Sequence, residues 1–385
     1  MEESSKIKLG DVVEKINDSV DLNERNGMFC VRGGHVPADV PVLLGYNIAG
    51  NEYLGPAFHR KFETGDVLFT SRVPHKVGLA TFSGICANTT LVLRSKDPVL
   101  TQKMLPNLLQ TNKFKSFLKS ISRGSTNPFV NWTQLANFQV YIPSISKQKN
   151  IVEIIDNIDV LIQNKLRSVE LIGMIKRKLF SSHLKSYSGE KLMRFDETWK
   201  GSPEGGHTPK SVKHPTGSYV LTLACLGRDG FVPNQVKPIL DTEGHRKNTL
   251  EKGDLLISRS NTIQLVGRCC IIPQKMSNTS FGDLFFRINF DEESIIPSYA
   301  MYLLQSDMGV RYIRSISAGT SGSMKKINRK NLGKLMIPIV PIIEQKELLR
   351  GIDKLESIRS RASIEVEKLV QARSQILEKI LEKKS

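Results

Sequence analysis

The sequence predicts a mixed α/β (α+β) protein in which two similar lobes are separated by two long antiparallel helices that form a coiled coil. Three observations predict this fold. The 385 residues are too many for one ordinary core, the two halves carry the same motifs in the same order, and two long segments place apolar residues at helical spacing. We expect a first lobe over residues 1–145, a central helix over 146–185, a second lobe over 186–340 and a C-terminal helix over 341–385.

Each lobe is marked by the same two blocks of sequence. Residues 65–72 contain Gly-Asp, an apolar run and Ser-Arg, and residues 253–259 repeat this order. A second block leads from a small polar loop through a proline junction to Gln-Lys, at 121–149 in the first half and at 316–346 in the second. Because both blocks keep their order, the pattern indicates an internal duplication.

Each lobe is expected to contain both strands and helix. Short apolar runs bounded by Gly, Pro and Asn predict strands, as at residues 67–69, 90–93 and 255–257. Apolar residues at helical spacing predict one helix in each lobe, over 103–120 and over 298–314.

The two long helices are expected to pack on each other. Their apolar residues recur every three or four positions over about 35 residues, which corresponds to about 52 Å of helix. A bundle inside one enzyme domain and a homodimerisation coil remain alternatives to an intramolecular pair. The apolar seam comprises Ile151, Ile155, Ile158, Ile162, Leu166, Val169, Ile172, Ile175 and Leu179 in the first helix and Leu348, Ile352, Leu355, Ile358, Ala362, Val366, Leu369, Ile376 and Ile380 in the second.

The charge balance favours a polyanionic partner. Lys and Arg number 55 and Asp and Glu 38, which gives a net charge of +17. Nucleic acid is the first candidate, and an anionic membrane surface would be attracted by the same charge. The most apolar stretch, 335–343, is interrupted by Pro338 and Pro341 and is far shorter than the roughly 20 residues that span a bilayer.

The cysteines and the N-terminal segment predict a cytoplasmic protein. No basic start followed by an apolar run is present at residues 1–6. The five cysteines are scattered and lack the spacing of a zinc site, so we expect reduced structural thiols. They are Cys30, Cys86, Cys225, Cys269 and Cys270.

The sequence matches none of the catalytic motifs considered below. Segment 205–211 resembles a phosphate-binding loop but has Pro209 where that loop needs glycine, and residues 127–129 supply only one proline of a methyltransferase base-binding loop. The histidines lack metal-ligand spacing, and Asp66 and Asp254 are more simply turn residues than a nuclease pair. We therefore expect a non-catalytic chain with no cofactor and no metal.

Two loops in each half have side chains suited to DNA. At the strand ends, Arg and Asn can form paired hydrogen bonds with guanine and adenine, whereas Ser and Lys mostly hold phosphates. The alternative for Arg72 and Arg259 is an internal ion pair, and the alternative for the second loop is a plain flexible linker. Lys176-Arg177-Lys178 is expected to be a solvated face or a partner contact. The candidate DNA-binding residues are Ser71, Arg72, His75, Lys76, Arg123, Ser125, Asn127, Lys210, Ser258, Arg259, Ser260, Asn261, Lys325 and Lys326.

These motifs together resemble the specificity subunit of a type I restriction-modification enzyme, over essentially the whole chain. The junction at 341–346 is the best single match, and Gly-His-Thr-Pro at 206–209 is similar to a turn found early in many target-recognition domains of that family. Residues 143–148 lack the usual second proline and acidic residue, and the first lobe has no Gly-x-Thr-Pro turn.

The resemblance implies a sequence-specific reader of double-stranded DNA. Each lobe would read one half of a bipartite, asymmetric site, and the helices would set the spacer. The same helices would dock modification subunits, which bind S-adenosylmethionine and methylate adenine, and restriction subunits, which use ATP for translocation and cleavage. A non-catalytic RNA- or DNA-binding adaptor and the recognition module of a fused restriction-methylation enzyme are the alternatives.

Overall fold

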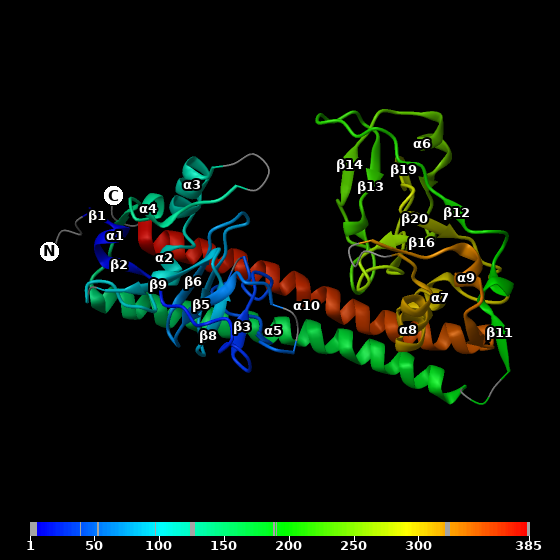
Figure 1. The fold of residues 1–385 in the computed structure, drawn as a ribbon, viewed down its shortest axis with the longest axis horizontal. Helices are drawn as coiled ribbons and strands as arrows, with labels where there is room; N and C mark the ends of the chain where they lie inside the picture. The colour runs from blue at the N-terminus through cyan, green and yellow to red at the C-terminus, as the bar shows by residue number, and fades with distance from the viewer. Residues whose placement is uncertain are drawn as a thin grey trace. The chain divides into compact units, whose positions relative to one another are not determined.

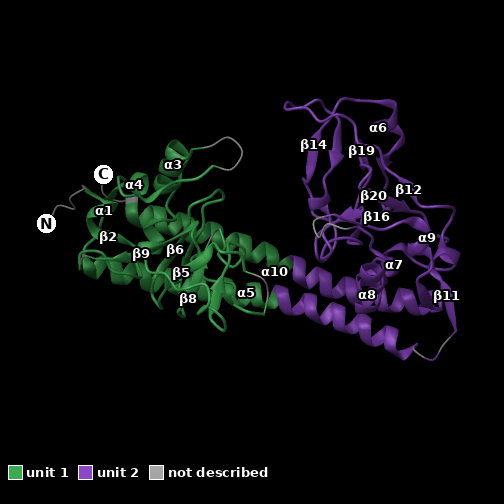
Figure 2. Cartoon of the chain, in the orientation of Figure 1, with its two compact units in different colours: residues 1–168, 361–385 green, residues 169–360 purple. Residues whose placement is uncertain are grey.

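The protein is described by a computed structural model that covers residues 6–38, 40–51, 54–96, 98–123, 128–187, 189, 191–319 and 324–382 (Figure 1). The chain divides into two compact units (Figure 2). The first contains residues 1–168 and 361–385, and the second contains residues 169–360. This division cuts through both long helices, so the four-part domain scheme expected from the sequence stays a prediction.

The first unit is built from two four-stranded sheets and a two-stranded ribbon. One sheet is antiparallel, with the order β2 (Val13–Ile16), β9 (Thr90–Ser95), β6 (Val67–Thr70), β7 (Val77–Leu79). The other has the order β4 (Asn47–Ile48), β3 (Phe29–Val31), β8 (Gly84–Ala87), β5 (Phe58–Phe62), and β3 runs parallel to β8. The ribbon pairs β1 (Lys6–Lys8) with β10 (Gln139–Tyr141), and the short helices are α1 (Leu9–Val12), α2 (Leu105–Leu108), α3 (Asn112–Ile121) and α4 (Trp132–Leu135).

The second unit repeats this plan. Its antiparallel sheet has the order β12 (Glu204–Gly205), β20 (Phe285–Ile288), β16 (Leu255–Ser258), β18 (Cys269–Ile271). Its second sheet has the order β14 (Val236–Pro238), β13 (Tyr219–Leu221), β19 (Met276–Ser280), β15 (Thr249–Leu250), and β13 runs parallel to β19. The ribbons are β11 (Leu192–Arg194) with β22 (Met336–Pro338) and β17 (Ser260–Asn261) with β21 (Lys325–Lys326), and the short helices are η1 (Phe195–Thr198), η2 (Leu223–Cys225), α6 (Glu243–Lys247), α7 (Pro297–Gln305), α8 (Asp307–Ile316) and α9 (Arg329–Gly333).

Two long helices complete the chain, as the seam predicts. They are α5 (Ile145–Ser186) and α10 (Ile342–Glu382). In the first unit, Asp159 bonds Arg373 and Lys165 bonds Glu365, so residue numbers rise along one helix as they fall along the other. The two helices are therefore antiparallel.

The single helix expected in each lobe is in fact two helices. Thr111 ends the expected 103–120 helix early and caps α3 by accepting a hydrogen bond from Phe114 N, at 3.2 Å. Ser306 does the same before α8, where it accepts from Gly309 N at 3.3 Å. Hydroxyl side chains satisfy the free amides at a helix start, so each break lies at a capping residue.

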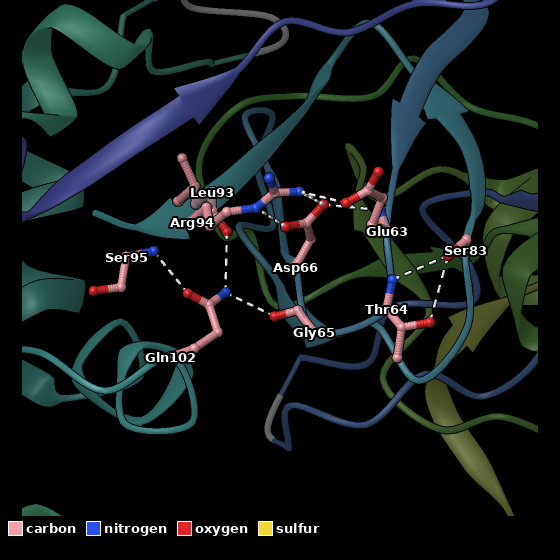
Figure 3. Close-up of polar contacts among 9 residues, drawn as sticks. All are labelled: Glu63, Thr64, Gly65, Asp66, Ser83, Leu93, Arg94, Ser95 and Gln102. Carbon is pink, nitrogen blue, oxygen red and sulfur yellow. Dashed lines mark hydrogen bonds and ion pairs between the residues drawn. The ribbon is translucent and has the colours of Figure 1, made fainter. Parts of the chain in front are cut away.

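The repeated Gly-Asp pair is a turn, as the sequence predicts, and Figure 3 shows the contacts of the first copy, Gly65-Asp66. Gly65 and Gly253 both have a φ of 94°, a conformation that favours glycine. The Asp66 carboxylate accepts a hydrogen bond from Glu63 N at 2.8 Å and pairs with Arg94 Nε at 2.8 Å. In the second unit Asp254 likewise accepts from Glu251 N, at 3.0 Å, and pairs with an arginine of the adjacent strand, Arg287.

A buried glutamine joins each long helix to its lobe. Gln148 accepts a hydrogen bond from Thr101 N at 2.8 Å and donates to Pro143 O at 2.8 Å. Gln345 accepts from Ile296 N at 3.0 Å and donates to Val340 O at 2.9 Å. The Gln-Lys motif of the repeat therefore has a structural role.

We expect Gln345→Ala to lower the free energy of unfolding by about 1–3 kcal/mol, because it leaves buried backbone groups without partners. Urea denaturation of the full chain measures this loss. The neighbouring exposed Lys346 provides the matched control, since Lys346→Ala removes no buried hydrogen bond. Equal stability of the two variants would contradict the proposed role of the glutamine.

Candidate nucleic-acid interface

In the first lobe the structure brings the two candidate loops together. The backbone amide of Val130 donates to Ser71 O at 2.9 Å, and that of Val73 donates to Pro128 O at 3.0 Å. Arg72 and Arg123 both form bridge pairs with Phe129. Both arginines are exposed, so one surface carries two guanidinium groups.

The other candidates of the first lobe mostly support this surface from within. The Ser71 hydroxyl is buried and donates to Thr89 O at 2.6 Å. It is therefore not accessible for the DNA contact that the sequence predicts. The half-buried His75 bonds Thr70 O and Ser122 Oγ, both at 3.2 Å, and burial lowers its pKa. Lys76 Nζ donates to Gly33 O at 3.0 Å. Ser125 and Asn127 lie outside the described residues.

The second lobe repeats the same arrangement. The backbone amide of Ile327 donates to Arg259 O at 3.0 Å, and β17 pairs with β21, with Ser260 opposite Lys326. Arg259 is exposed, and its guanidinium lies 5.4 Å from the centre of the Phe286 ring. Again, a strand-end arginine lies beside the segment that follows the second loop.

The remaining DNA-binding candidates of the second lobe differ in how far their side chains are buried. The prediction that Ser258 and Ser260 face DNA is wrong, because Ser258 is fully buried and Ser260 is 4% exposed. Asn261 is half-buried and its side-chain oxygen accepts from Thr262 N at 2.9 Å. Lys325 is half-buried and donates to Gly319 O at 2.5 Å. Lys326 and Lys210 are both exposed.

The internal ion-pair alternative for the strand-end arginines finds no support. Among the residues that the structure describes, neither Arg72 nor Arg259 has a carboxylate within ion-pair distance. Within the described part of the chain, the Arg259 side chain makes one hydrogen bond, a long one of 3.5 Å to Asp283 O. Both guanidinium groups are therefore able to bind an external acceptor.

Sequence reasoning missed Arg329. Its guanidinium lies 5.0 Å from the centre of the Phe286 ring, the ring that Arg259 also contacts. A cavity of about 440 Å³ is lined by these three residues and by Ile327, Asn328, Lys330 and Asn331. The basic run Lys325-Lys326 followed by Arg329-Lys330 is a sequence signal that could have identified it.

The Gly-x-Thr-Pro turn lies against the loop at 281–284, which leads into β20 and Phe286. A Cβ on Gly206 would lie 2.3 Å from Phe281 O and 2.4 Å from Gly282 O, so only glycine fits there. Thr208 Oγ1 donates to the Asp283 side chain at 2.5 Å and accepts from Asp283 N at 3.0 Å. The turn therefore fixes the loop that carries Lys210.

The apolar seam of the long helices is confirmed in part. Ile151, Ile155, Ile162 and Ile352 are buried, and four further seam residues, Ile158, Leu348, Leu355 and Leu369, are partly buried. The prediction is wrong at Ile358 of α10, which is 45% exposed, and at Ile175 and Leu179 of α5, which are 52% and 40% exposed. In that part of α5 the buried positions are Gly173, Lys176 and Phe180.

Lys176 is thus not part of a solvated face. It is 3% exposed and bonds Glu356 on α10, and its ammonium lies 5.6 Å from the Tyr302 ring centre. In the first unit, Arg373 and Asp159 form the corresponding pair. Lys176 and Arg373, like Asp159 and Glu356, are separated by 197 residues, so the duplication preserved an ion pair between the helices in which the cation is buried.

Several large apolar side chains of the long helices remain exposed. On α5, Val160 and Leu161 are 53% and 52% exposed in the first unit, and Met174 is 52% exposed in the second. On α10, Ile364 is 50% exposed. A contiguous exposed apolar patch is typical of a surface that contacts another protein, whereas single exposed apolar side chains are common on protein surfaces.

Metal-ligating side chains do not cluster among the described residues. No group of three or more His, Cys, Asp and Glu there could hold a metal ion. The five cysteines are free and buried, and burial raises the pKa of Cys86 and of Cys269 to about 12. Within this part of the chain, no helix has the length and apolar character needed to cross a membrane.

Comparisons with known proteins point to one family. The model of the type I restriction modification DNA specificity domain matches residues 1–171 and 228–368. The putative type I restriction enzyme MjaX specificity subunit of Methanocaldococcus jannaschii is 26% identical over 79% of this chain and 75% of that protein. The type I restriction enzyme StySPI specificity subunit of Salmonella potsdam is 22% identical over 66% of this chain and 58% of its own length.

Solved structures cover nearly the whole chain at low identity. One, from a study of complex assembly and conformational transition of the type I R-M system, covers 98% of this chain and 97% of its own, with 14% identity and a TM-score of 0.49. The HsdS subunit from Thermoanaerobacter tengcongensis covers 99% of this chain and 97% of its own, with 15% identity and a TM-score of 0.41.

Proposed function

The chain belongs to the type I restriction modification DNA specificity family, and we propose that it reads a bipartite, asymmetric DNA site with one lobe on each half. In this family role the chain recognises DNA and leaves catalysis to its partners. One observation carries the proposal: each lobe places an exposed strand-end arginine, Arg72 or Arg259, beside the segment that follows the second loop.

The chemistry of these surfaces suits base recognition. A guanidinium can donate two parallel hydrogen bonds to the O6 and N7 of guanine, which distinguishes this base from the others in the major groove. Arg123 and Lys326 lie nearby and are suited to phosphates, which position the protein but carry little sequence information. Arg329 is a further candidate for the second half-site.

The long helices are proposed to provide both the spacer and the docking surface. Their exposed apolar residues suit contact with modification subunits, which would bind S-adenosylmethionine. Restriction subunits, which would hydrolyse ATP, would then join that assembly. The +17 charge fits a partner with a phosphate backbone. Action on cellular DNA fits the cytoplasmic location that the sequence predicts.

The proposal predicts that each arginine controls one half-site. With Arg259→Ala, we expect base preference to relax in one half-site by about 1–3 kcal/mol, because a paired contact to a base is lost. Arg72→Ala is the matched control and is expected to relax the other half-site. The measurement is methylome sequencing of cells that contain the variant together with its modification subunit.

Two outcomes would contradict this assignment. If both variants relax the same half-site, the lobes do not read separate halves. One variant could instead weaken DNA binding equally for all sequences and reduce the salt dependence of binding by about one phosphate contact. In that case the arginine binds the DNA backbone and does not read a base.

A further inference from the structure

A cavity of about 310 Å³ lies in the second unit, and the strand-end arginine Arg259 is not one of its lining residues. Its wall is formed by residues 173–181 of α5, the loop at 228–229, the segment 264–268 and residues 302–314 of α7 and α8. Small-molecule sites typically start at about 300 Å³ and combine apolar walls with a few polar groups. Phe180, Tyr302 and Val266 supply the apolar part here.

The cavity has a strong excess of positive charge. Five basic side chains line it, against two carboxylates. The basic residues are Lys176, Arg177, Arg228, Arg268 and Arg314, and the acidic residues are Asp229 and Asp307.

The carboxylates do not neutralise this charge. Asp229 is already shared by Arg177, at 3.1 Å, and by Arg359 of α10, at 2.9 Å. Lys176 is held by Glu356. Among the residues that the structure describes, Arg228, Arg268 and Arg314 have no carboxylate within ion-pair distance, and Asp307 is exposed at the start of α8.

Arg268 is the most buried of these three arginines. It is half-buried, and its pKa is lowered by burial first and by the charge of Arg228 second, while Asp229 acts in the opposite direction. Two like charges that approach each other in a partly dry site are unfavourable unless an anion joins them.

The duplicated half provides an internal comparison. A corresponding cavity of about 350 Å³ in the first unit is lined by Gln110, Lys115, Glu367 and Arg373, among others. Arg373 is fully occupied there by Asp159 and its neighbours. The cluster of unpaired arginines is therefore specific to the second unit and is not a consequence of the repeated fold.

We propose that the cavity lined by Arg228, Arg268 and Arg314 binds a phosphate-bearing ligand of about nucleotide size. Planar guanidinium groups present paired donors that match phosphate oxygens. The apolar wall would accommodate the non-phosphate part of the ligand. The same chemistry could be supplied by a free nucleotide or by a backbone phosphate of DNA, and the experiment separates these sources.

The test is calorimetric titration of the full chain with ATP and with inorganic phosphate, at physiological ionic strength and without divalent metal. We expect one saturable site for ATP, and at least tenfold weaker binding to an Arg228→Ala/Arg268→Ala variant. The matched control is Arg311→Ala, because Arg311 is an exposed residue of the same helix as Arg314 and does not line the cavity. Circular dichroism checks folding, and the single change Arg228→Ala, at an exposed site, replaces the double variant if the latter is unfolded.

A titration with duplex DNA identifies the source of the phosphate. If the cavity variant also weakens DNA binding and its salt dependence, the ligand is the DNA backbone; if only ATP binding is lost, the ligand is a free phosphate compound. The proposal is wrong if neither phosphate probe saturates a site, if Arg311→Ala causes the same loss, or if citrate binds as tightly as ATP.

Discussion

Replacing Arg373 by methionine is expected to lower the free energy of unfolding of the first unit by about 3–5 kcal/mol. Arg373 is 2% exposed and donates to Asp159 Oδ1 at 2.5 Å, to Gln110 Oε1 at 2.8 Å and to Asn107 Oδ1 at 2.7 Å. Methionine keeps much of the volume but leaves a buried carboxylate and two buried amide oxygens without a donor. The loss therefore comes from unpaired groups and not from a cavity.

The chain contains a convenient probe for this measurement. Its two tryptophans, Trp132 and Trp199, pack against the cores of the first and second units respectively. In a Trp199→Phe background, the fluorescence of Trp132 during urea denaturation follows the first unit alone. Lys165→Met provides the control, because Lys165 pairs with Glu365 at an exposed position and exposed pairs contribute little.

The pH dependence separates lost charge pairing from lost packing. Burial raises the pKa of Asp159, and Arg373 opposes this effect. Without Arg373 the folded-state pKa rises further above the unfolded value, so stability falls as pH rises from the unfolded pKa toward the folded one. The cost of Arg373→Met should thus be smaller near pH 4.5 than at pH 7.5. A double change to Arg373→Met/Asp159→Leu should recover the pH-dependent part of the loss, whereas the part due to the unpaired Gln110 and Asn107 oxygens should remain. A double variant that keeps the pH dependence of the single variant would contradict our explanation.

Local patterns were sufficient to predict the architecture of this chain. The Gly-Asp turn, the Gln-Lys junction and the seam of the long helices recur in both halves, so each copy supports the other. Thr111 and Ser306 also carried a readable signal, because each precedes a new helix as a capping residue. The longer helices expected there came from counting apolar spacing across the caps.

Burial of polar residues could not be predicted in the same way. Lys176 reads as part of a basic run, and it is buried because Glu356, 180 residues away in sequence, lies opposite it. The sequence predicts Ser258 at an accessible strand end, yet β16 lies between β20 and β18, and all four of its residues are buried. Such positions depend on partners that are distant in sequence, which a local pattern does not contain.

The candidate DNA surface shows the same limit. Arg72, Arg123, Arg259 and Lys326 are exposed, as a contact residue must be, and were identifiable from residue type and position at a loop. Arg329 was missed because it lies near Arg259 only through the ring of Phe286 on β20, which both guanidinium groups contact. Residue type identified the chemistry, and the structure was needed to show which groups share a surface.

The second large effect is expected from lengthening both long helices. We expect a four-residue helical insertion after Ser168 in α5 and after Ser360 in α10 to lengthen the preferred DNA spacer and to leave both half-sites unchanged. Four residues add about 6 Å of helix, and base pairs rise 3.4 Å each, so the spacer should grow by at most about two base pairs. These positions lie where the two compact units divide, so neither lobe is altered.

The insertion in a single helix is the decisive control. A turn added to α5 alone would shift Lys176 relative to Asp159 along α10, so the Lys176–Glu356 pair and the Asp159–Arg373 pair could not both be kept. We expect that variant to lose stability and defined spacing, whereas the double insertion keeps the helices in register. Selection from a duplex library with spacers of varied length measures the preference. An unchanged spacer with the double insertion would mean that the helices do not set the distance between half-sites, even if each lobe still reads its own half.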